Sequence, residues 1–302
     1  MLLVSRPVRS QDDNIKAGIA WMLLTTLFFI SLDALAKYLV SSYPVIQVVW
    51  GRFLFHLILA ALILGPRLGF FSRSANLPLQ IVRSILLLAT TVLFFYGVRL
   101  LPLADASAIM FTSPILLSIL AIPWLGEKVG PYRWAAIFVA FLGALVVVRP
   151  GTGVMGAGAL FLLGCAVCNA CYQIITRQLR GTDEARTTLL YTALAGTVGT
   201  SLAVPLVWTP IALGDWPLFA ALGAFGCLGH FTLIKSFQAA PATVVAPFSY
   251  ASIIWAIFYG FIFFGELPDF WTLTGATIIA AGGLYILHRE QKRKAKKPRD
   301  DL

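Results

Sequence analysis

Residues 94–151 read FFYGVRLLPLADASAIMFTSPILLSILAIPWLGEKVGPYRWAAIFVAFLGALVVVRPG. Two apolar runs, 103–125 and 131–149, fill most of this stretch, and a turn that begins at Gly126 separates them. A tight break at Pro102 separates the first run from the apolar segment before it. A helix of roughly 20 apolar residues crosses a hydrocarbon core of about 30 Å. The stretch therefore predicts two consecutive membrane-spanning helices.

The composition of the 302-residue chain extends this prediction to the whole protein. Apolar residues make up 59% and charged residues 12% of the chain, whereas soluble domains have about 45–50% and about 25%. So few polar residues cannot cover a water-soluble core, and lipid is the expected solvent. The net charge of +10 comes from Lys and Arg scattered between apolar runs and at the C-terminus, which argues against a nucleic-acid partner.

Ten apolar runs of spanning length occur along the chain, separated by Pro, Gly and charged residues. They are 17–38, 43–64, 79–100, 103–125, 131–149, 155–177, 187–208, 216–238, 241–264 and 270–288. We therefore predict an all-α integral membrane protein with ten transmembrane helices. The first run is interpreted as a retained helix, because no cleavable signal peptide is recognisable before it.

Lys and Arg gather on one side of this layout, and cytoplasmic loops carry an excess of these residues. With the N-terminus inside, the inner stretches hold Arg6, Arg9, Lys16, Arg67, Arg73, Arg83, Lys128, Arg133, Arg177, Arg180, Arg186 and the basic tail. The outer side keeps Lys37, Arg99 and Arg149. The pattern predicts a protein of the cell (inner) membrane with both termini in the cytoplasm.

The two halves of the chain match at one constant spacing, which we call the repeat offset. It takes Pro102 to Pro241 and the Gly-Glu pair at Gly126 to the pair at Gly265. Further matches at this offset are Gly143 with Gly282, Phe111 with Tyr250, Ser113 with Ser252 and Tyr132 with Trp271. Each half then holds five helices, and an odd number makes the two halves inverted. Inverted repeats are typical of alternating-access transporters, whose substrate site lies near the bilayer midplane.

This repeat divides the chain into four parts. They are a cytoplasmic N-terminal segment (1–16), a first five-helix repeat (17–149), a second five-helix repeat (155–288) and a basic cytoplasmic tail (289–302). The tail is expected to anchor the topology, with binding of anionic membrane lipids as the alternative. A homodimer is left open as the assembly.

The motifs in these repeats resemble the EamA-type drug/metabolite transporter family. The likeness rests on the tyrosine-to-proline turn after Tyr96, the Ser-Pro pair at Ser113, the Leu-Gly-Glu turn and the glycine-bearing helix after it. Segment two adds an Arg-Phe pair at Arg52, and the second half repeats the pattern more loosely. The resemblance implies two inverted five-helix repeats around a central cavity, lined by the first four helices of each half. It also implies cargo such as amino acids, cationic drugs, nucleotide sugars, riboflavin or S-adenosylmethionine.

Asp33 and Arg52 are the charged residues placed deep in the first two segments. Ionisable groups at such depth are costly and usually functional or paired. Asp33 is a candidate for cation recognition or proton coupling, and the alternative is a structural pair with Lys37 one turn later. Arg52 is a candidate ligand for a carboxylate or phosphate, and the alternative is an ion pair or carbonyl contact that holds helices together. His56 lies one turn beyond Arg52 and is expected to share its surroundings or to be a packing residue.

A second group of candidates lies in the later segments. His230 is a candidate coupling residue that could titrate with Asp33, whereas Lys235 is expected to snorkel to the cytoplasmic surface. Side chains suited to stacking or orienting a solute are Tyr96, Asn169, Tyr172, Gln173 and Tyr250, with packing as the alternative for each.

These observations favour a secondary transporter of a small organic metabolite, such as an amino-acid derivative or a vitamin. No ATP-binding P-loop and no G-x-S-x-G or H-E-x-x-H motif occurs, so we expect no enzyme, with an intramembrane enzyme or a channel as the alternative. We expect no cofactor and no metal site. Cys165, Cys168 and Cys171 have metal-like spacing without an accompanying His or acid, and we interpret them as packing residues.

Overall fold

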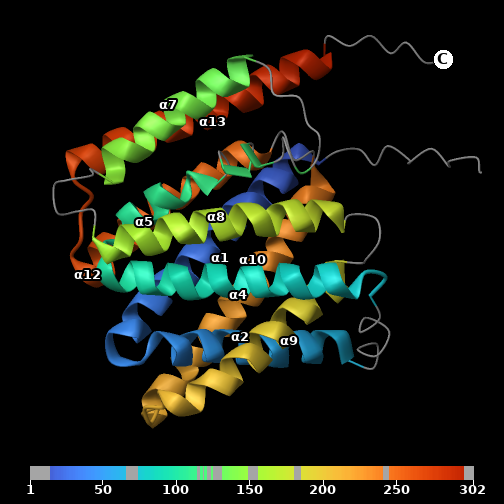
Figure 1. Cartoon of the computed structure of the whole chain (residues 1–302), viewed down its shortest axis with the longest axis vertical. Coiled ribbons are helices and arrows are strands. Elements are labelled where there is room, and N and C mark those ends of the chain that lie inside the picture. The colour runs from blue at the N-terminus through green and yellow to red at the C-terminus, as the bar shows by residue number, and fades with distance from the viewer. Residues whose placement is uncertain are drawn as a thin grey trace, which may run out of the picture.

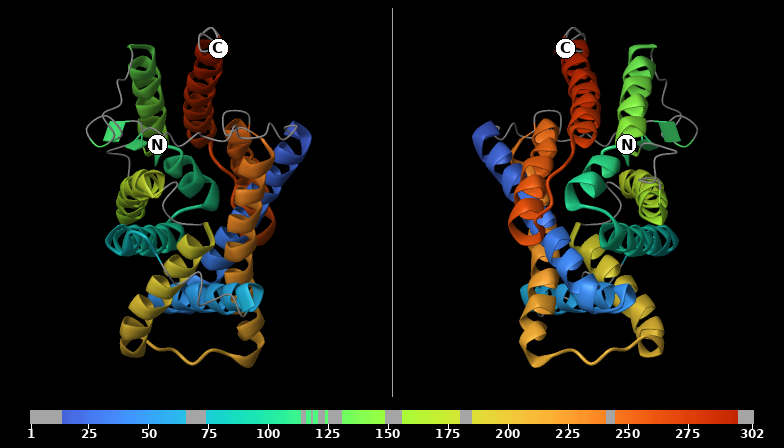
Figure 2. Two further views of the ribbon diagram at one scale, coloured as in Figure 1. Left: turned by 90° about the vertical axis from the view of Figure 1, so that its right-hand side faces the viewer. Right: turned by 90° about the vertical axis from the view of Figure 1, so that its left-hand side faces the viewer.

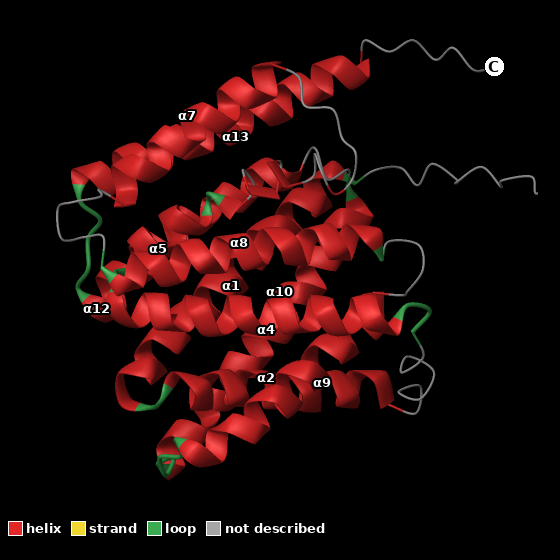
Figure 3. Cartoon of the chain, in the orientation of Figure 1, coloured by secondary structure: helices red, strands yellow, loops and turns green. Residues whose placement is uncertain are grey.

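The structure is a computed structural model, and its described part consists of helices and the turns between them (Figure 3). It describes residues 14–65, 74–113, 131–148, 156–179, 185–240 and 245–295, with single positions between 116 and 124. The α-helices are α1 (Ile15–Ser42), α2 (Val45–Leu64), α4 (Leu77–Leu100), α5 (Leu103–Met110), α7 (Pro131–Val148), α8 (Ala157–Gln178), α9 (Ala185–Ala203), α10 (Trp216–Ala239), α12 (Ser252–Phe264) and α13 (Phe270–Ala295). Short 3₁₀ turns cover Val204–Leu206, Leu213–Asp215 and Ala246–Ala251.

Six helices of the described part are long and apolar enough to cross a membrane, namely α1, α2, α4, α8, α9 and α10. The chain is therefore a multi-pass membrane protein. Two expected boundaries move: α13 continues as helix to Ala295, so the basic tail begins inside a helix, and the run 241–264 contains the 3₁₀ turn before α12. The Gly126 turn and residues 1–13 lie outside the described residues.

The helices run between two ends of the molecule, which are its right and left sides in Figure 1. One end holds the start of α1 and the end of α13, and we call it the terminal end. The other holds the turns 43–44, 101–102 and 265–269, and we call it the hairpin end. The chain therefore passes between the same two ends repeatedly, as a membrane-spanning chain must.

Each long helix of the first half has a counterpart in the second half, close to the place that the repeat offset predicts. The pairs are α1 with α8, α2 with α9, α4 with α10 and α7 with α13. The match is closest for α4 and α10, which are both 24 residues long and begin at Leu77 and Trp216. The offset that the motifs show in the last part of each half thus extends to helix boundaries throughout the described chain.

The paired helices separate into two bundles rather than into two halves of the sequence. The first bundle is α1, α2, α10 and α12, and the second bundle is α8, α9, α4 and α5 (Figure 2). Within them, the closest packing joins α1 to α10 and α4 to α8. Helices α7 and α13, which correspond to the fifth run of each expected repeat, pack on each other at one edge of the molecule (Figure 1).

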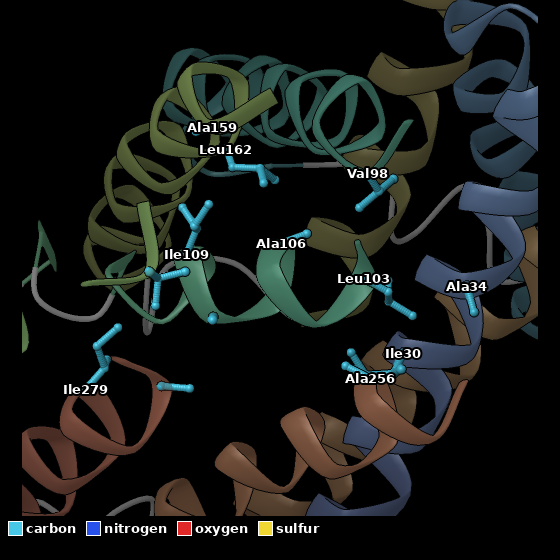
Figure 4. Close-up of a cluster of buried hydrophobic side chains, with 13 residues drawn as sticks. Ile30, Ala34, Val98, Leu103, Ala106, Ile109, Ala159, Leu162, Ala256 and Ile279 are labelled. Atoms are coloured by element: carbon cyan, nitrogen blue, oxygen red, sulfur yellow. The ribbon is translucent and has the colours of Figure 1, made fainter. Parts of the chain in front are cut away.

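The short helix α5 lies where the two bundles meet. Its buried residues Leu103, Ala106 and Ile109 contact a core cluster that also contains Ala34 of α1 and Leu162 of α8 (Figure 4). Alternation of large and small side chains on α5 lets helices from both bundles approach it closely. The boundary between the bundles is therefore closed partly by apolar packing.

Glycines on one face of α10 allow the first bundle to pack tightly. A Cβ added at Gly223 would lie 2.7 Å from the backbone nitrogen of His56 on α2, and one at Gly229 would lie 2.7 Å from the ring of Phe29 on α1. Close approach over small residues is a common source of helix association in lipid, where the hydrophobic effect is absent. Gly223 and Gly229 thus let α10 pack closely against α2 and α1.

The hairpin end is tied together by polar contacts to the segment that precedes α10. The Tyr43 hydroxyl donates to Asp215 at 2.6 Å, and this hydrogen bond raises the pKa of Tyr43. The Gln47 amide donates to the Thr209 carbonyl at 2.7 Å and its oxygen accepts from the Thr209 amide at 2.9 Å. These contacts fix the turn between α1 and α2, and hence the start of α2.

The two ends should lie on opposite sides of a membrane. Ser74→Cys at the terminal end should react with an impermeant thiol reagent from one side, here expected to be the cytoplasm. Leu213→Cys and Leu267→Cys, whose parent residues are exposed at the hairpin end, should react from the other side. The measurement is labelling of intact and inverted vesicles, with the native cysteines replaced by alanine. Reaction of positions 74 and 267 from the same side would refute this arrangement.

Gly223→Ala should destabilise the protein, because the added methyl group meets backbone atoms of α2 that cannot rotate away. Overpacking of this kind costs about 1–3 kcal/mol, which should lower the melting temperature in detergent. Gly214→Ala is the matched control, since a Cβ there meets nothing within 4 Å. Equal melting temperatures for the two variants would mean that α2 and α10 are not closely packed.

Candidate functional site

Two residues of opposite charge, Asp33 and Arg52, lie in the middle of the molecule on neighbouring helices of the first bundle. Asp33 lies on α1 and is half-buried. Helix α1 is packed by α10, α12, α4, α2 and α5, and Asp33 interacts with Arg52 of α2. Arg52 lies in the first half of α2 and is 7% exposed.

Arg52 reaches from the first bundle to the second. The Nη1 atom of its guanidinium donates to the hydroxyl of Thr91 on α4. Its Nε is buried without a hydrogen-bond partner among the described residues. A buried donor that lacks a partner costs about 1–3 kcal/mol or more for a charged group. This atom is therefore a position where a solute could supply the missing acceptor.

Asp33 and Arg52 interact electrostatically without a direct ion-pair contact between these two described side chains. A Cβ added at Gly226 of α10 would lie 3.7 Å from Nε of Arg52 and 3.7 Å from Nδ1 of His56. The glycine thus leaves room next to both polar groups. The two opposite charges, separated but in the same interior region, suit a ligand that carries both signs.

Two histidines continue the site away from Asp33. His56 on α2 is 1% exposed, and its Nε2 is buried without a hydrogen-bond partner in the described part of the chain. The ring of His230 on α10 lies 6.0 Å from the His56 ring and packs edge-on against Phe29 at 5.2 Å. We call Asp33, Arg52, His56 and His230 the central polar cluster.

Lys37 does not pair with Asp33, so the structural alternative for that acid is wrong. The Lys37 ammonium lies 2.9 Å from the carboxylate of Glu266 and donates to the carbonyl of Leu101 at 2.6 Å. Residues four apart on a helix share a face, but the long lysine stem carries its charge towards the hairpin end. Asp33 is left facing Arg52.

By sequence, Arg83 counts among the basic residues of an inner stretch, and the structure corrects this assignment. Arg83 lies within α4, is 5% exposed and donates to hydroxyls of Thr176 at 2.8 Å, Thr192 at 2.7 Å and Tyr172 at 2.7 Å. Its guanidinium also lies 4.6 Å from the centre of the Tyr172 ring. The second bundle thus holds its own buried arginine, whose donors are satisfied by side chains of α8 and α9. Hydroxyl residues scattered along helices gave no sequence signal for this cluster.

The remaining candidates are dispersed through the second bundle and the boundary. Tyr172 contacts Arg83, and Gln173, half-buried, follows it on α8. Tyr96 stacks on Phe161 with ring centres 5.2 Å apart, which favours its packing role.

Two further candidates contact the chain just after α5. The amide of Asn169 donates to Ser113 at 3.0 Å, and Tyr250 packs edge-on against Phe111 at 5.1 Å. The structure therefore brings Asp33, Arg52 and His230 together and leaves Tyr172 and Tyr250 in separate contacts. In the described part of the chain, no group of three or more metal-binding side chains occurs.

Comparison with known proteins connects this arrangement to transport. The chain is 28% identical over 284 residues to the S-adenosylmethionine uptake transporter of Rickettsia bellii, covering 93% of this chain and 96% of that one. It is 29% identical over 272 residues to a pseudopaline exporter of Pseudomonas aeruginosa, covering 88% and 94%. It is 26% identical over 283 residues to a riboflavin transporter of Rhizobium johnstonii, covering 92% and 93%.

The fold and the family agree with these likenesses. A solved crystal structure matches with a TM-score of 0.65 and 17% identity, covering 93% of this chain and 99% of that one, which shows a shared fold. The EamA-like transporter family matches residues 16–149 and again residues 156–288. Since these two matches together span nearly the whole chain, the protein belongs to the EamA-like transporter family.

Proposed function

We propose that this chain is a secondary transporter that moves a small organic metabolite bearing both charge signs across the cell (inner) membrane. An amino-acid derivative has this character. The observation that carries the proposal is the pairing of Asp33 with Arg52 in the interior, close enough to interact and without a direct contact. A carboxylate of the solute would accept from Nε of Arg52, and its ammonium group would approach Asp33.

The relatives support this class of cargo without fixing one compound. One is named for S-adenosylmethionine, which is itself an amino-acid derivative, and another for riboflavin, whose flat ring would suit the aromatic residues of the interior. One relative is named as an uptake protein and another as an exporter. The direction of transport is therefore a property to be measured on this chain.

Alternating access between two inverted five-helix repeats, with ten spans in all, is the proposed mechanism. Phe111 and Tyr250 correspond to each other at the repeat offset, and their ring centres lie 5.1 Å apart. Two positions related by a two-fold axis can touch only near that axis, so this contact supports an axis at the boundary between the bundles. The counterpart helices α7 and α13, and α2 and α9, also contact each other. A solute site between bundles related in this way can open to either side.

Coupling to protons is a second part of the proposal, and it involves Asp33 and His230. Asp33 is the carboxylate of the central polar cluster, and His230 lies beside His56 in the same cluster. A single acid that binds either a proton or a cationic group exchanges one for the other. In this scheme the proton and the solute ammonium compete for Asp33.

Solute counterflow in proteoliposomes is the test of the transport proposal. A thermal-shift screen of the purified protein against amino-acid derivatives and vitamins would supply the solute, and preloaded vesicles should then accumulate the labelled compound transiently. An intramembrane enzyme would change the compound chemically, and a channel would give equilibration without counterflow. Either result would reject the carrier.

Arg52→Lys should weaken solute binding while leaving the protein folded, because lysine keeps the charge but loses the planar fork and Nε. Loss of a hydrogen bond to a charged group corresponds to about 1.5–3 kcal/mol, so the apparent affinity should fall about 10- to 100-fold in counterflow. Lys16→Arg, at an exposed lysine in the first turn of α1, is the control for a change between the two basic residues and should transport normally. If Arg52→Lys transports like the parent and Arg52→Ala merely lowers the folded yield, Arg52 is a structural tie.

Asp33→Asn should abolish concentrative uptake and leave counterflow measurable, since the amide cannot bind a proton but still accepts a hydrogen bond from an ammonium group. The assay compares accumulation driven by an imposed pH gradient with counterflow at equal pH. Asp215→Asn is the control for an acid at the hairpin end, where an amide still accepts from Tyr43. Persistent pH-driven accumulation by the Asp33→Asn protein would exclude Asp33 as the coupling residue.

A further inference from the structure

The Gly-Glu turn after α12 has a structural purpose that its sequence alone does not show. Gly265 has a φ of +65°, a conformation suited to glycine, and it ends α12. The amides of Gly265 and Glu266 donate back to the carbonyls of Phe261 and Gly260 at 3.0 and 2.9 Å. This reversal directs the Glu266 side chain across the hairpin end, towards α1 and the second bundle.

Glu266 takes part in a set of contacts that joins the two bundles. One carboxylate oxygen lies 2.9 Å from the Lys37 ammonium, and the other accepts from the backbone amide of Leu103 at 3.2 Å. Lys37 donates in turn to the carbonyl of Leu101 at 2.6 Å. Lys37 and Glu266 belong to the first bundle and the turn after it, whereas Leu101 and Leu103 border the α4–α5 turn of the second bundle. We call these four groups the hairpin-end latch.

The latch lies between an open pocket and the central polar cluster. A cavity of about 300 Å³ at the hairpin end is lined by both bundles, with Lys37, Tyr38, Ser41, Phe264 and Glu266 on one side and Val98 and Arg99 on the other. Lys37 forms part of this lining, and Asp33 lies one helical turn deeper on the same face of α1. Along α1, Lys37 of the latch thus lies between the rest of the pocket lining and Asp33.

The sulfur of Cys165 reports whether the way from this pocket to Asp33 is closed. Cys165 lies on α8 of the second bundle, interacts electrostatically with Asp33 and Arg52, and donates to the Thr90 carbonyl at 3.2 Å. Its exposed fraction is 0% in this structure, in which the latch is formed. Cys165 is therefore shielded while the pocket outside the latch stays open.

We propose that the hairpin-end latch is the gate through which the central polar cluster opens to the hairpin-end side of the membrane. Opening separates the carboxylate of Glu266 and the ammonium of Lys37 from the α4–α5 turn, so that the two bundles part at this end. The inference rests on the proposed transport function, and it identifies which contacts control access from this side. The two bonds that cross the boundary, from Lys37 to Leu101 and from Leu103 to Glu266, can break and re-form, since the net strength of a single hydrogen bond is small.

The test measures access to Cys165 rather than transport. A protein that keeps Cys165, with Cys168, Cys171 and Cys227 replaced by alanine, is treated with a small impermeant methanethiosulfonate from each side of sealed vesicles. The side reached by the Leu213→Cys protein identifies the hairpin end. Because no solute is added, a chain that carried no solute would still give a labelling result, and counterflow tests the function separately.

Glu266→Gln is the informative variant, because it removes the charge that holds the Lys37 ammonium at the boundary and weakens the hydrogen bond from the Leu103 amide, which a carboxylate accepts more strongly than an amide. Labelling of Cys165 from the hairpin-end side should rise about five-fold, the ratio that corresponds to about 1 kcal/mol for a partly exposed ion pair. Labelling from the terminal end should not rise. Lys37→Gln should raise labelling at least as much, because it also removes the hydrogen bond to Leu101, and the rises of the two single variants should not add in the double variant, since both remove the same ion pair.

Lys235→Gln is the matched control, since this exposed lysine of α10 contacts Phe231 of its own helix. It should leave labelling unchanged. Unchanged labelling in the Glu266→Gln and Lys37→Gln proteins, or an equal rise from both sides, would overturn the gate. A lower melting temperature without the one-sided rise would show that the latch is a static tie, which also overturns it.

Discussion

A bilayer offers no water to satisfy a polar group, and this constraint determines the positions of the charges in the structure. The backbone meets this constraint by forming helices, in which the amides and carbonyls bond to each other within one segment. Side-chain charges must find partners on other helices, and the buried arginines do so in different ways. Arg83 is satisfied by three hydroxyl groups of the second bundle, whereas Arg52 has one such partner and a buried Nε without one among the described residues. The unpaired Nε of Arg52 distinguishes the interior between the bundles from an ordinary contact between helices.

The arrangement of helices explains why this incompleteness lies at a boundary. Each bundle mixes both halves of the sequence, so helices with the same place in the repeat face one another across the molecule. Apolar contacts of α5 and the Phe111–Tyr250 pair close part of that boundary. Such contacts are not directional, so they do not fix one relative position of the two bundles. Polar contacts across it in the described chain include Trp50 with Ser201, Arg52 with Thr91 in the middle, and the hairpin-end latch at one end. A boundary of this kind holds the two bundles together without many ion pairs between them.

Much of the helical layout follows from local sequence, because the length of an apolar run and the turn residues at its ends are local properties. The runs at 79–100 and 216–238 nearly coincide with the observed helices α4 and α10. The count of ten spans, and the topology built on it, remain predictions. The site was predictable only in part. Depth along a helix identified Asp33 and Arg52, but their partners depend on which helices meet. Lys37 shows the difficulty. Its spacing from Asp33 on one helix suggested that these two residues pair, but the partner of Lys37 is Glu266, which comes from a turn near the end of the other half of the chain.

The two ends of the boundary are chemically unequal, although the repeat makes them equivalent in position. At the repeat offset, Asp33 and Lys37 correspond to Tyr172 and Thr176. The first pair is charged and serves the central cluster and the latch, whereas the second carries neutral hydroxyls that bind Arg83 within a single bundle. A carrier built from such repeats would therefore have different polar contacts in its two closed ends. Such a difference in polar contacts would make the energies of the two open states differ, and the solute, by bridging Asp33 and Arg52, would act on charges that contribute to this difference.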